Sequence, residues 1–436
     1  MPAKKKRRPA KKKAPPKKKK APTKHPKQAE ISIGMIGHVD HGKSTLTEAL
    51  TGKFPDTHSE EIRRGISIRL GYAETEFREC PECESPAKYT TLKKCPVCGN
   101  ETILLRRVAF VDAPGHEVLM ATMLSGASIM DGALLVVAAN ERVPMPQTRE
   151  HLAAMEIIGM ERVIFCQNKI ELVSEKAAIQ NYKDLKKFIS TTNTKNSPII
   201  PISAIHHTNI DMLIQNIEEH LPTPKRDESL TPRMLVARSF DVNKPGRSPT
   251  KLKGGVVGGS IVQGKFSVND EIEIRPGNRK GSKWQVINTK IVSLRSGFGE
   301  LKTALSGGLI GIGTNIDPSL TKSDSLVGQI VGYPDELPPI WDMLEFDSHL
   351  LERVVGSEVQ TVVQAIELNE NLMLSVGTAK TVGKVTRTSK KGIQVDLRLP
   401  VCADLGTRVA ISRQIDRRWR LIGWGVTKGG KEQRQN

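Results

Sequence analysis

The sequence lacks any long run of hydrophobic residues. Its longest uninterrupted apolar stretch is the short segment 133–139, whereas a helix that crosses a bilayer needs about 20 apolar residues. The basic N-terminal region is also not followed by the apolar segment that a signal peptide requires. These absences exclude a protein with a transmembrane helix, and they favour a cytoplasmic protein that does not engage membranes over a secreted one.

Acidic residues are missing from the first 28 positions, which hold 12 Lys, 2 Arg and 6 Pro. This segment supplies +14 of the formal net charge of +19, so the rest of the chain is nearly neutral. Such a segment repels itself and buries little, which predicts a disordered basic tail over residues 1–29. Two interpretations stay open: a flexible arm that neutralises nucleic-acid phosphates, or a solubilising or targeting tail without specific contacts.

After the tail, apolar strand-like segments alternate with helical ones. This alternation predicts βαβ units and a doubly wound, mainly parallel sheet. Strands are expected at 31–36, 108–111, 133–139, 163–166 and 199–202, and helices at 43–50, 147–158 and 176–189.

The pattern changes at a proline-containing linker near residues 221–227. Beyond it, short β-rich segments such as 254–262 and 271–274 are punctuated by glycine, which predicts β-barrels or β-sandwiches. Pro338 and Pro339 indicate a boundary between two of them. We therefore expect an α/β domain at 30–222 and β-barrel domains at 223–339 and 340–436.

A phosphate-binding motif connects the first predicted strand to the first predicted helix. Residues 37–44, GHVDHGKS, fit the pattern G-x-x-x-x-G-K-[ST] in the required strand-loop-helix context. Backbone N–H groups of such a loop wrap phosphates, and the helix N-terminus adds positive potential. Lys43 can reach the β and γ phosphates, and the Ser44 hydroxyl can ligate magnesium. The sequence therefore predicts a P-loop nucleotide site.

Three later motifs follow strands of the same predicted sheet. Asp112 can hold the magnesium shell through water, and Gly115 can offer its N–H group to the γ-phosphate. A carboxylate at Glu171 can accept two N–H bonds from a guanine edge, whereas adenine lacks that donor pattern. Because ligands bind beyond the carboxyl ends of parallel strands, we expect these groups to converge. The predicted nucleotide-binding residues are Asp40, His41, Gly42, Lys43, Ser44, Thr45, Asp112, Gly115, Asn168, Lys169, Glu171, Ser203, Ala204 and Ile205.

Four of the six cysteines form two C-x-x-C pairs, Cys80 with Cys83 and Cys95 with Cys98. In a cytosolic chain, two such pairs predict a closed, tetrahedral and structural zinc site. The segment 78–102 has little apolar material of its own, so the metal would serve as its core. The alternatives are two disulfides, which are rare in a reducing compartment, or four free thiols.

The order of these motifs resembles that of the translational GTPases related to elongation factor Tu. More narrowly, several strings resemble the gamma subunit of archaeal and eukaryotic translation initiation factor two, from about Glu30 to the end of the chain. These strings are RRGISIRLGYAETEF, DAPGHEVLMATMLSGA, RSFDVNKPG, KLKGGVVGGSI and AISRQIDRRWRLIGWG. The resemblance implies an α/β P-loop GTPase domain with a zinc-knuckle insert, followed by two β-barrels.

The resemblance also implies roles for residues around the switches. His116 matches the histidine that positions the attacking water, with Val39 and Ile66 as the apolar gate beside it. Ser67 matches the switch 1 hydroxyl that joins magnesium, where the family more often has Thr. Asp40 and Gly65 match a second magnesium site. The expected catalytic residues are therefore His116, Asp40 and Gly115, and the expected magnesium residues are Ser44, Ser67, Asp40, Gly65 and Asp112.

By the same resemblance, the chain carries initiator methionyl-tRNA to the small ribosomal subunit and its mRNA start complex, with GTP or GDP, magnesium and zinc bound. Its expected partners are the alpha and beta subunits of the factor and another initiation factor that stimulates hydrolysis. Segment 251–261 is a candidate wall of the tRNA site, although a tight hairpin would look the same. Basic residues near Trp419 are candidates for phosphate contacts, or else an ordinary solvated strand face: Arg413, Arg417, Arg418 and Arg420.

Three other functions remain open at this stage. A carrier of elongator or selenocysteinyl-tRNA would not prefer methionine. The GTPase subunit of a sulfate-activating enzyme would ignore tRNA altogether. A scaffold that uses GTP only structurally would bind the nucleotide without turnover.

Overall fold

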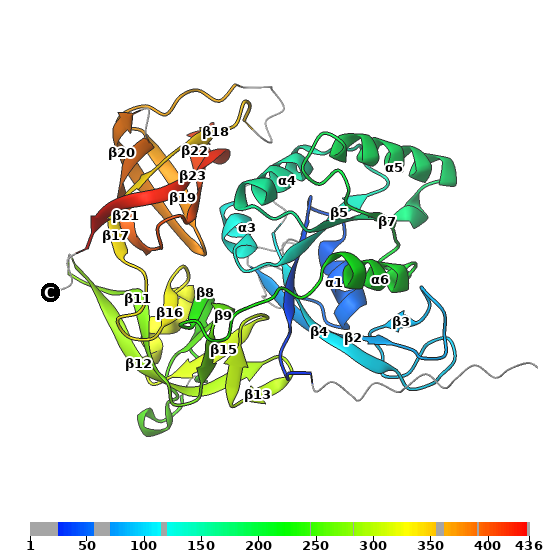
Figure 1. The fold of residues 1–436 in the computed structure, drawn as a ribbon, viewed down its shortest axis with the longest axis horizontal. Coiled ribbons are helices and arrows are strands. Elements are labelled where there is room, and N and C mark those ends of the chain that lie inside the picture. The colour runs from blue at the N-terminus through cyan, green and yellow to red at the C-terminus, as the bar shows by residue number, and fades with distance from the viewer. Residues whose placement is uncertain are drawn as a thin grey trace, which may run out of the picture.

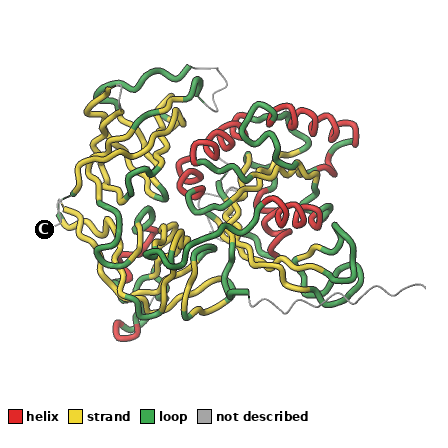
Figure 2. Tube along the Cα trace, in the orientation of Figure 1, coloured by secondary structure: helices red, strands yellow, loops and turns green. Residues whose placement is uncertain are grey.

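The computed structural model describes residues 25–55, 70–114, 120–244, 246–281, 283–354, 362–389 and 392–433. Figure 1 shows three bodies: an α/β domain on the right and two β-barrels stacked on the left. The helices belong mainly to the α/β domain, whereas the barrels consist almost entirely of strands and loops (Figure 2). The α/β-plus-two-barrel architecture predicted from the sequence is thus confirmed.

The α/β domain is built on a seven-stranded sheet with the order β3-β2-β4-β1-β5-β6-β7. Strands β4, β1, β5, β6 and β7 run parallel, whereas β2 pairs with β4 antiparallel. The elements are β1 (Ile31–Gly37), α1 (Lys43–Thr51), β2 (Gly71–Glu79), β3 (Tyr89–Thr90), β4 (Ile103–Asp112), α3 (Met120–Ala127), β5 (Gly132–Ala138), α4 (Pro146–Ile158), β6 (Val163–Asn168), η2 (Ile170–Leu172), α5 (Glu175–Ile189), β7 (Ile199–Pro201) and α6 (Ile210–His220).

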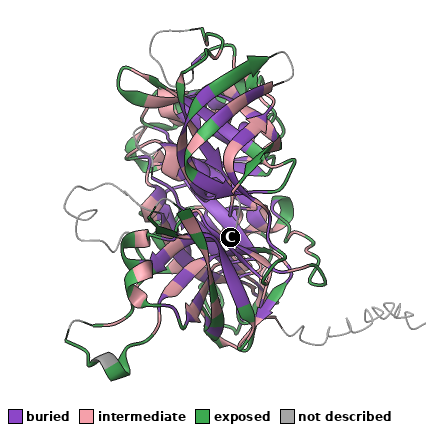
Figure 3. Ribbon diagram, turned by 90° about the vertical axis from the view of Figure 1, so that its left-hand side faces the viewer, coloured by how far each residue is buried: buried purple, intermediate pink, exposed green. Residues whose placement is uncertain are grey.

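Helices cover both faces of this sheet, which explains why its central strands are apolar without alternation. Leu46 of α1 and Leu213 of α6 share one buried cluster with one face. Met123 of α3, Met155 of α4 and Leu185 of α5 share a second cluster with the other face. Figure 3, viewed from the side of the barrels, shows that buried residues are likewise concentrated in the strands there.

Local sequence signals explain where the helices begin and end. Helix α4 begins with Pro146 and ends before Gly159, which has a φ of 85°. Proline suits the first helical position because its missing N–H would have no partner there, and glycine tolerates the left-handed conformation that ends a helix. Helix α5 begins after Ser174, whose side chain accepts a hydrogen bond from the N–H of Ala177.

Each barrel closes through one additional strand pair. In the first barrel the order β11-β16-β8-β9-β15-β12 is closed by β12 pairing with β11, and in the second the order β17-β21-β20-β19-β22-β23 is closed by β23 pairing with β17. The first contains β8 (Arg233–Phe240), η3 (Pro249–Lys251), β9 (Val256–Gln263), β10 (Lys265–Ser267), β11 (Glu271–Lys280), β12 (Lys283–Ser296), β13 (Gly299–Leu301), β14 (Thr303–Leu305), β15 (Ile310–Thr314), η4 (Pro318–Asp324) and β16 (Ile330–Gly332). The second contains β17 (Ile340–Phe346), β18 (His349–Leu350), β19 (Asn371–Val376), β20 (Ala379–Ser389), β21 (Gly392–Cys402), β22 (Arg408–Ile415) and β23 (Arg418–Glu432).

The second barrel packs on α3 and α4 through basic side chains. Arg408 donates to the carbonyl oxygen of Ile157 at the C-terminal end of α4, at 2.6 Å, where a positive charge is favoured by the helix dipole. Arg420 forms an ion pair of 2.6 Å with Glu150 of α4. Lys380 donates to the Thr122 hydroxyl of α3 at 3.0 Å. The α/β domain is therefore tied to this barrel at three points.

These contacts change the interpretation of the arginine cluster around Trp419. Arg420 lies in the interface with α4, and Arg413 pairs with Glu370 at 2.5 Å while donating to the carbonyl oxygens of Gln364 and Ala365. The sequence suggests four neighbouring arginines for phosphate contact, but two of them, Arg413 and Arg420, form ion pairs within the protein. Arg417 and Arg418 are exposed.

The predicted basic tail lies outside the described residues except for its last five positions. Of those, Gln28 and Ala29 are buried at 2% and 0% exposure, so the packed part of the chain begins earlier than the sequence indicates. Composition alone places the start of the packed chain too late, because Gln28 and Ala29 directly follow the lysines and carry no apolar pattern. In the part of the chain that the structure describes, no helix is long and apolar enough to cross a membrane.

Candidate functional site

The phosphate-binding loop lies between β1 and α1, and two glycines set its shape. Gly37 has a φ of 149°, and a Cβ there would lie 2.3 Å from the carbonyl oxygen of Val136. Gly42 has a φ of 88°, and a Cβ there would lie 2.4 Å from Asn168 Nδ2. Both positions therefore require glycine. Lys43 is buried and its Nζ donates to the carbonyl oxygen of His38 at 2.8 Å, which holds the ammonium group across the loop.

Two oxygen ligands suited to magnesium meet at the end of this loop. Ser44 Oγ donates to Asp112 Oδ2 at 2.7 Å, and Asp112 is fully buried at the end of β4. A hydroxyl and a carboxylate are hard oxygen ligands, which magnesium prefers. The pair fits the predicted arrangement of a direct hydroxyl ligand with an acidic group behind it.

The segments predicted to bind guanine lie at the same edge of the sheet. Asn168 at the end of β6 connects them, because its Nδ2 donates to the carbonyl oxygen of His41 at 2.9 Å and its Oδ1 accepts from the N–H of Ala204 at 3.0 Å. Lys169 has a φ of 63°, and it precedes the short helix that carries the exposed Glu171. Asn168 therefore joins the phosphate loop to the segment of Ser203, Ala204 and Ile205.

For His41 and for the segment 203–205, burial decides which groups a nucleotide can reach. The His41 side chain is fully buried, and its ring contacts the carbonyl oxygen of Val136 at 3.0 Å and Glu141 at 3.1 Å. Only its backbone can face a phosphate. Ser203 and Ala204 are buried, whereas Ile205 is 66% exposed, so it can cover a bound base from the solvent side.

Several predicted residues lie outside the described part of the chain: Gly65, Ile66, Ser67, Gly115 and His116. Asp40 and Val39 are described, and Asp40 has a φ of 60°. Thr45 is half-buried in the first turn of α1.

Sequence reasoning missed a group of neutral histidines beneath the loop. His151 of α4 is buried, and burial together with the nearby Lys43 charge lowers its pKa to about 3. Burial also lowers the pKa of His38 and His41, whose rings lie 5.1 Å apart. These imidazoles are therefore uncharged at neutral pH and do not repel Lys43. No motif signals this, because His151 lies more than 100 positions from the loop.

The four predicted zinc ligands converge in the turn-rich segment between β2 and β4. Their Sγ atoms all lie within 4.8 Å of one another, with Cys80 to Cys98 at 3.4 Å and Cys83 to Cys95 at 3.7 Å. Tetrahedral zinc with bonds of about 2.3 Å to each sulfur would separate the sulfurs by about 3.8 Å. The thiols thus fit a single metal ion. Cys166 and Cys402 are buried elsewhere.

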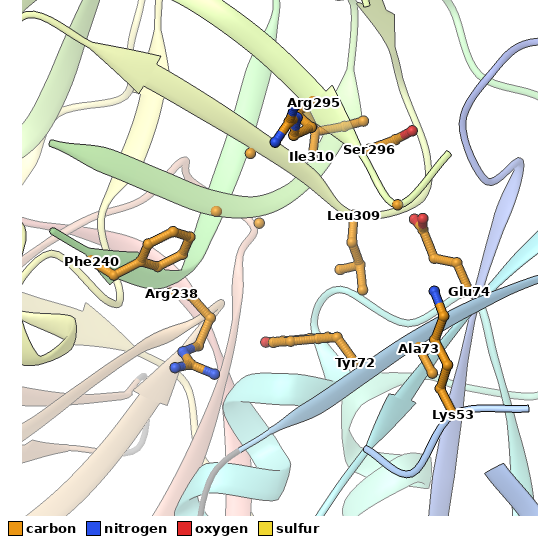
Figure 4. A pocket seen from close by; sticks show the side chains of 14 residues that line it. Lys53, Tyr72, Ala73, Glu74, Arg238, Phe240, Arg295, Ser296, Leu309 and Ile310 are labelled. Carbon is orange, nitrogen blue, oxygen red and sulfur yellow. The ribbon is translucent and has the colours of Figure 1, made fainter. Parts of the chain in front are cut away.

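A pocket lies between β2 of the α/β domain and the first barrel (Figure 4). It has a volume of about 280 Å³. Tyr72 and Glu74 line one side, and Arg238, Phe240 and the glycines of β9 line the other. A larger groove of about 690 Å³ adjoins it through Phe240, Arg295 and Gly311. The segment 251–261, expected as a wall of a tRNA site, contributes to both hollows.

Glu74 is an unusual group for a pocket of this kind. Its two carboxylate oxygens are buried and make no hydrogen bond of ordinary geometry with the described residues. Burial raises the pKa of Glu74 to about 7, although the nearby N–H groups of Gly297 and Leu309 partly oppose this. Figure 4 shows its carboxyl group pointing toward the loop of the barrel near Ser296. Burial also raises the pKa of Tyr72.

Comparisons with known proteins match all three bodies. Residues 28–223 match the Elongation factor Tu GTP binding domain, residues 254–332 match Elongation factor Tu domain 2, and residues 342–427 match Initiation factor eIF2 gamma, C terminal. Translation initiation factor 2 subunit gamma from Pyrococcus abyssi is 58% identical over 406 residues, covering 92% of this chain and 98% of that protein. The same subunit from Methanocaldococcus jannaschii is 57% identical, again covering 92% of this chain and 98% of that protein.

The chain belongs to the family of translation initiation factor 2 gamma subunits. The expected family is therefore confirmed. The chain is thus a member of the translational GTPases, which bind guanine nucleotides, usually with magnesium, and hydrolyse GTP.

Solved structures show the same fold at lower identity. A bacterial selenocysteine-specific elongation factor superimposes with a TM-score of 0.70 at 23% identity, covering 91% of this chain and 58% of that protein. The elongation factor SELB from Methanococcus maripaludis gives a TM-score of 0.68 at 23% identity, covering 93% of this chain and 80% of that one. These likenesses concern the fold alone.

Replacing Gly42 tests the geometry of the phosphate loop. In this gamma-subunit chain, Gly42→Ala strains the backbone and pushes a methyl group against Asn168, so we expect GTP and GDP affinity to fall about tenfold or more. Gly52→Ala is the matched control, because Gly52 also has a positive φ but nothing within 4 Å of an added Cβ. Nucleotide titration of both variants measures the difference. Equal affinities of Gly42→Ala and the unaltered chain would contradict this account.

Metal analysis tests the cysteine cluster. We expect one bound metal ion per chain in the unaltered protein and its loss in Cys80→Ser, with a lower melting temperature because the segment loses its core. Cys402→Ala removes a thiol outside the cluster and should keep the ion. A chain that holds no metal while its four cysteines are reduced would exclude the site.

The pH dependence of stability tests the buried Glu74. An unfolded carboxyl ionises near 4.5 and the folded one near 7, so the stability that Glu74 contributes is full below about pH 4.5 and is lost as the pH rises to 7. The Glu74→Gln variant cannot ionise. Its free energy of unfolding should therefore rise relative to the unaltered chain between pH 5 and 8, by at most about 3 kcal/mol.

Glu76, two positions along the same strand, is the matched control. Burial alone would raise the pKa of Glu76, but Arg107 and Arg78 outweigh it and lower the pKa. Glu76→Gln should therefore be less stable than the unaltered chain at neutral pH. Chemical unfolding at several pH values measures both variants, and a constant difference for Glu74→Gln would show that Glu74 does not titrate on unfolding.

Proposed function

We propose that this chain is a GTP-dependent carrier of initiator methionyl-tRNA to the small ribosomal subunit, and that it releases the tRNA after GTP hydrolysis. The observation that carries the proposal is the position of the inter-domain pocket. Gly71, the first residue of β2, pairs with Asp112 of the magnesium site. The next residue, Tyr72, lines the pocket. A structural change at the magnesium and γ-phosphate would therefore be only one residue away from Tyr72 in the pocket wall.

The pocket and its adjoining groove offer surfaces for a tRNA end that carries an amino acid. Phe240, Val242 and Leu252 give the groove apolar side chains, which suit an apolar side chain such as methionine. Arg238 and Arg295 provide guanidinium groups that can contact phosphate, although each also pairs with a carboxylate, Asp324 and Glu300 respectively. Strand β2 lines the opposite wall of the pocket. It follows the predicted switch 1 residues in the sequence.

The switch residues complete the cycle. In the GTP state Ser67 would ligate magnesium and Gly115 would donate to the γ-phosphate, and hydrolysis would remove these contacts from the segments that precede β2 and follow β4. His116 positions the attacking water, with Asp40 and Gly65 at a second magnesium ion. The Glu171 carboxylate accepts hydrogen bonds from the N–H groups of the guanine edge. The ion of the cysteine cluster is zinc, which thiolates of this spacing favour.

The proposed partners follow from the family. They are the alpha and beta subunits of the factor, the small ribosomal subunit with mRNA, and an initiation factor that stimulates hydrolysis. The basic tail neutralises RNA phosphates without reading sequence.

A carrier of selenocysteinyl-tRNA is the second candidate, because solved factors of that kind share the fold. Their 23% identity contrasts with 56–58% for initiation factor 2 gamma subunits, which favours the initiation role. The similar relatives named above are initiation factor 2 gamma subunits, which favours the initiation role over a GTPase subunit for sulfate activation.

The deciding experiment is an affinity comparison at fixed salt. The full chain with its alpha subunit is titrated with methionylated initiator tRNA and methionylated elongator tRNA, each with a GTP analogue and with GDP. We expect tight binding only for initiator tRNA with the GTP analogue. Equal binding in all four cases would mean nonspecific attraction to phosphate and would contradict the proposal. In the same system, His116→Ala should keep GTP binding and lose stimulated hydrolysis; undiminished hydrolysis would remove His116 from the catalytic residues.

A further inference from the structure

The segment of residues 25–30 lies between the α/β domain and the first barrel and bonds to both. On the α/β side, Arg107 of β4 donates to the carbonyl oxygen of Pro26 at 2.5 Å, and the N–H of Glu30 donates to the carbonyl oxygen of Arg107 at 2.8 Å. On the barrel side, the Ser296 hydroxyl donates to the carbonyl oxygen of Lys27 at 2.6 Å. We call residues 25–30 the N-terminal clasp.

Gln28 makes the most specific contacts of the clasp. Its Nε2 donates to the carbonyl oxygens of Leu305 at 2.8 Å and Gly307 at 3.3 Å, and its Oε1 accepts from the N–H of Leu305 at 2.9 Å. The side chain makes three hydrogen bonds, and the residue is 2% exposed. The side chain thus pairs with the backbone of the barrel as a neighbouring strand would.

The barrel segments that the clasp holds are those that line the inter-domain pocket. Gln28 binds the end of β14 and the loop after it, and the pocket is lined by Leu309 at the end of this loop and by Ile310, the first residue of β15. Lys27 anchors Ser296, and both Ser296 and Gly297 line the pocket beside Glu74. The clasp therefore lies behind two adjoining parts of the pocket wall.

The neighbouring contacts leave little room for the loop to shift. Gly308 has a φ of 65°, and a Cβ there would lie 2.6 Å from the carbonyl oxygen of Ala29. Arg226, from the linker between the domains, donates to the carbonyl oxygen of Glu30 at 3.1 Å and pairs with Asp131 at 2.5 Å. The guanidinium group of Arg107 lies 5.0 Å from the ring of Phe298.

We propose that Gln28 is a positioning residue for the ligand of the inter-domain pocket, because it fixes the barrel wall of that pocket against the α/β domain. The inference rests on the proposed function, in that the ligand is the aminoacyl end of a tRNA. Gln28 does not touch this ligand. It acts through the loop from Leu305 to Ile310, and its action is separate from the attraction of the basic tail for phosphate.

Two variants break the clasp at different places. Gln28→Ala removes the three bonds to the barrel, and Ser296→Ala removes the bond to Lys27. Both should lower affinity for methionylated initiator tRNA with a GTP analogue, by about tenfold for Gln28→Ala. The fold-loss of tRNA affinity in the double variant should be smaller than the product of the two single fold-losses, because both substitutions disrupt the same clasp. Lys27→Ala is the control, since the exposed Lys27 contributes only its carbonyl oxygen to the clasp.

Salt dependence separates the clasp from the tail. Deletion of residues 2–24 removes the charge of the tail, so it should reduce the slope of affinity against salt. Gln28→Ala should lower affinity at every salt concentration without changing that slope. GTP and GDP affinities should stay unchanged in all these chains.

Hydrogen exchange supplies a readout without tRNA. In Gln28→Ala, the amides of 296–311 should exchange faster, whereas those of the cysteine segment 80–98 should not change. Faster exchange with unchanged tRNA affinity would overturn the positioning role, as would unchanged exchange. If Gln28→Ala does not fold, Gln28→Glu replaces it, because Glu keeps the acceptor and loses both donated bonds.

The two proposals fail in different ways. If the unaltered chain does not prefer initiator tRNA with the GTP analogue, the proposed function is wrong. If it does, and Gln28→Ala binds equally well, only the clasp inference is wrong.

Discussion

The hydrogen bond between Ser44 and Asp112 is the contact on which the rest of the arrangement depends. It joins the start of α1 to the end of β4, and β4 pairs with β1 on one side and β2 on the other. The phosphate loop leaves β1, and the inter-domain pocket begins on β2. Strand pairing on both edges of β4 thus relates the phosphate loop to the pocket wall, and the buried Asp112 carboxylate bonds to the start of α1 at the same point.

The convergence of the described residues predicted to bind the nucleotide could be foreseen from the sequence because its signals are local. The string from Gly37 to Ser44 combines a strand end, glycines and a helix start within eight positions, and Asp112, Asn168 and Ser203 each follow an apolar strand. A parallel sheet brings such strand ends to one edge whatever the intervening lengths. The cysteine pairs are equally local, because two residues between the thiols already direct both at one ion.

The inter-domain features could not be predicted, because their partners are far apart in the sequence. Gln28 bonds to Leu305, 277 positions away, and Arg420 pairs with Glu150 at a separation of 270. Neither residue differs locally from an ordinary solvated glutamine or arginine. Glu74 lies in a strand whose alternation predicts half-burial, but its raised pKa follows from the approach of the barrel. Family resemblance suggested segment 251–261 as a wall of a tRNA site; the segment lines the pocket and the groove, and its contact with tRNA stays a prediction.

The α/β domain meets its two barrels through interfaces of opposite character. Toward the second barrel, Arg408 caps the end of α4, Arg420 pairs with Glu150, and Lys380 reaches α3, so charged groups are paired across a filled contact (Figure 1). Toward the first barrel the clasp also makes hydrogen bonds, but this interface contains the pocket and the Glu74 carboxyl, which is buried without a hydrogen bond of ordinary geometry to the described residues. A hollow interface gains free energy when a ligand fills it, whereas a filled one can only lose contacts by moving. Ligand-dependent adjustment is therefore expected on the side of the first barrel, where β2 brings the nucleotide site next to the pocket.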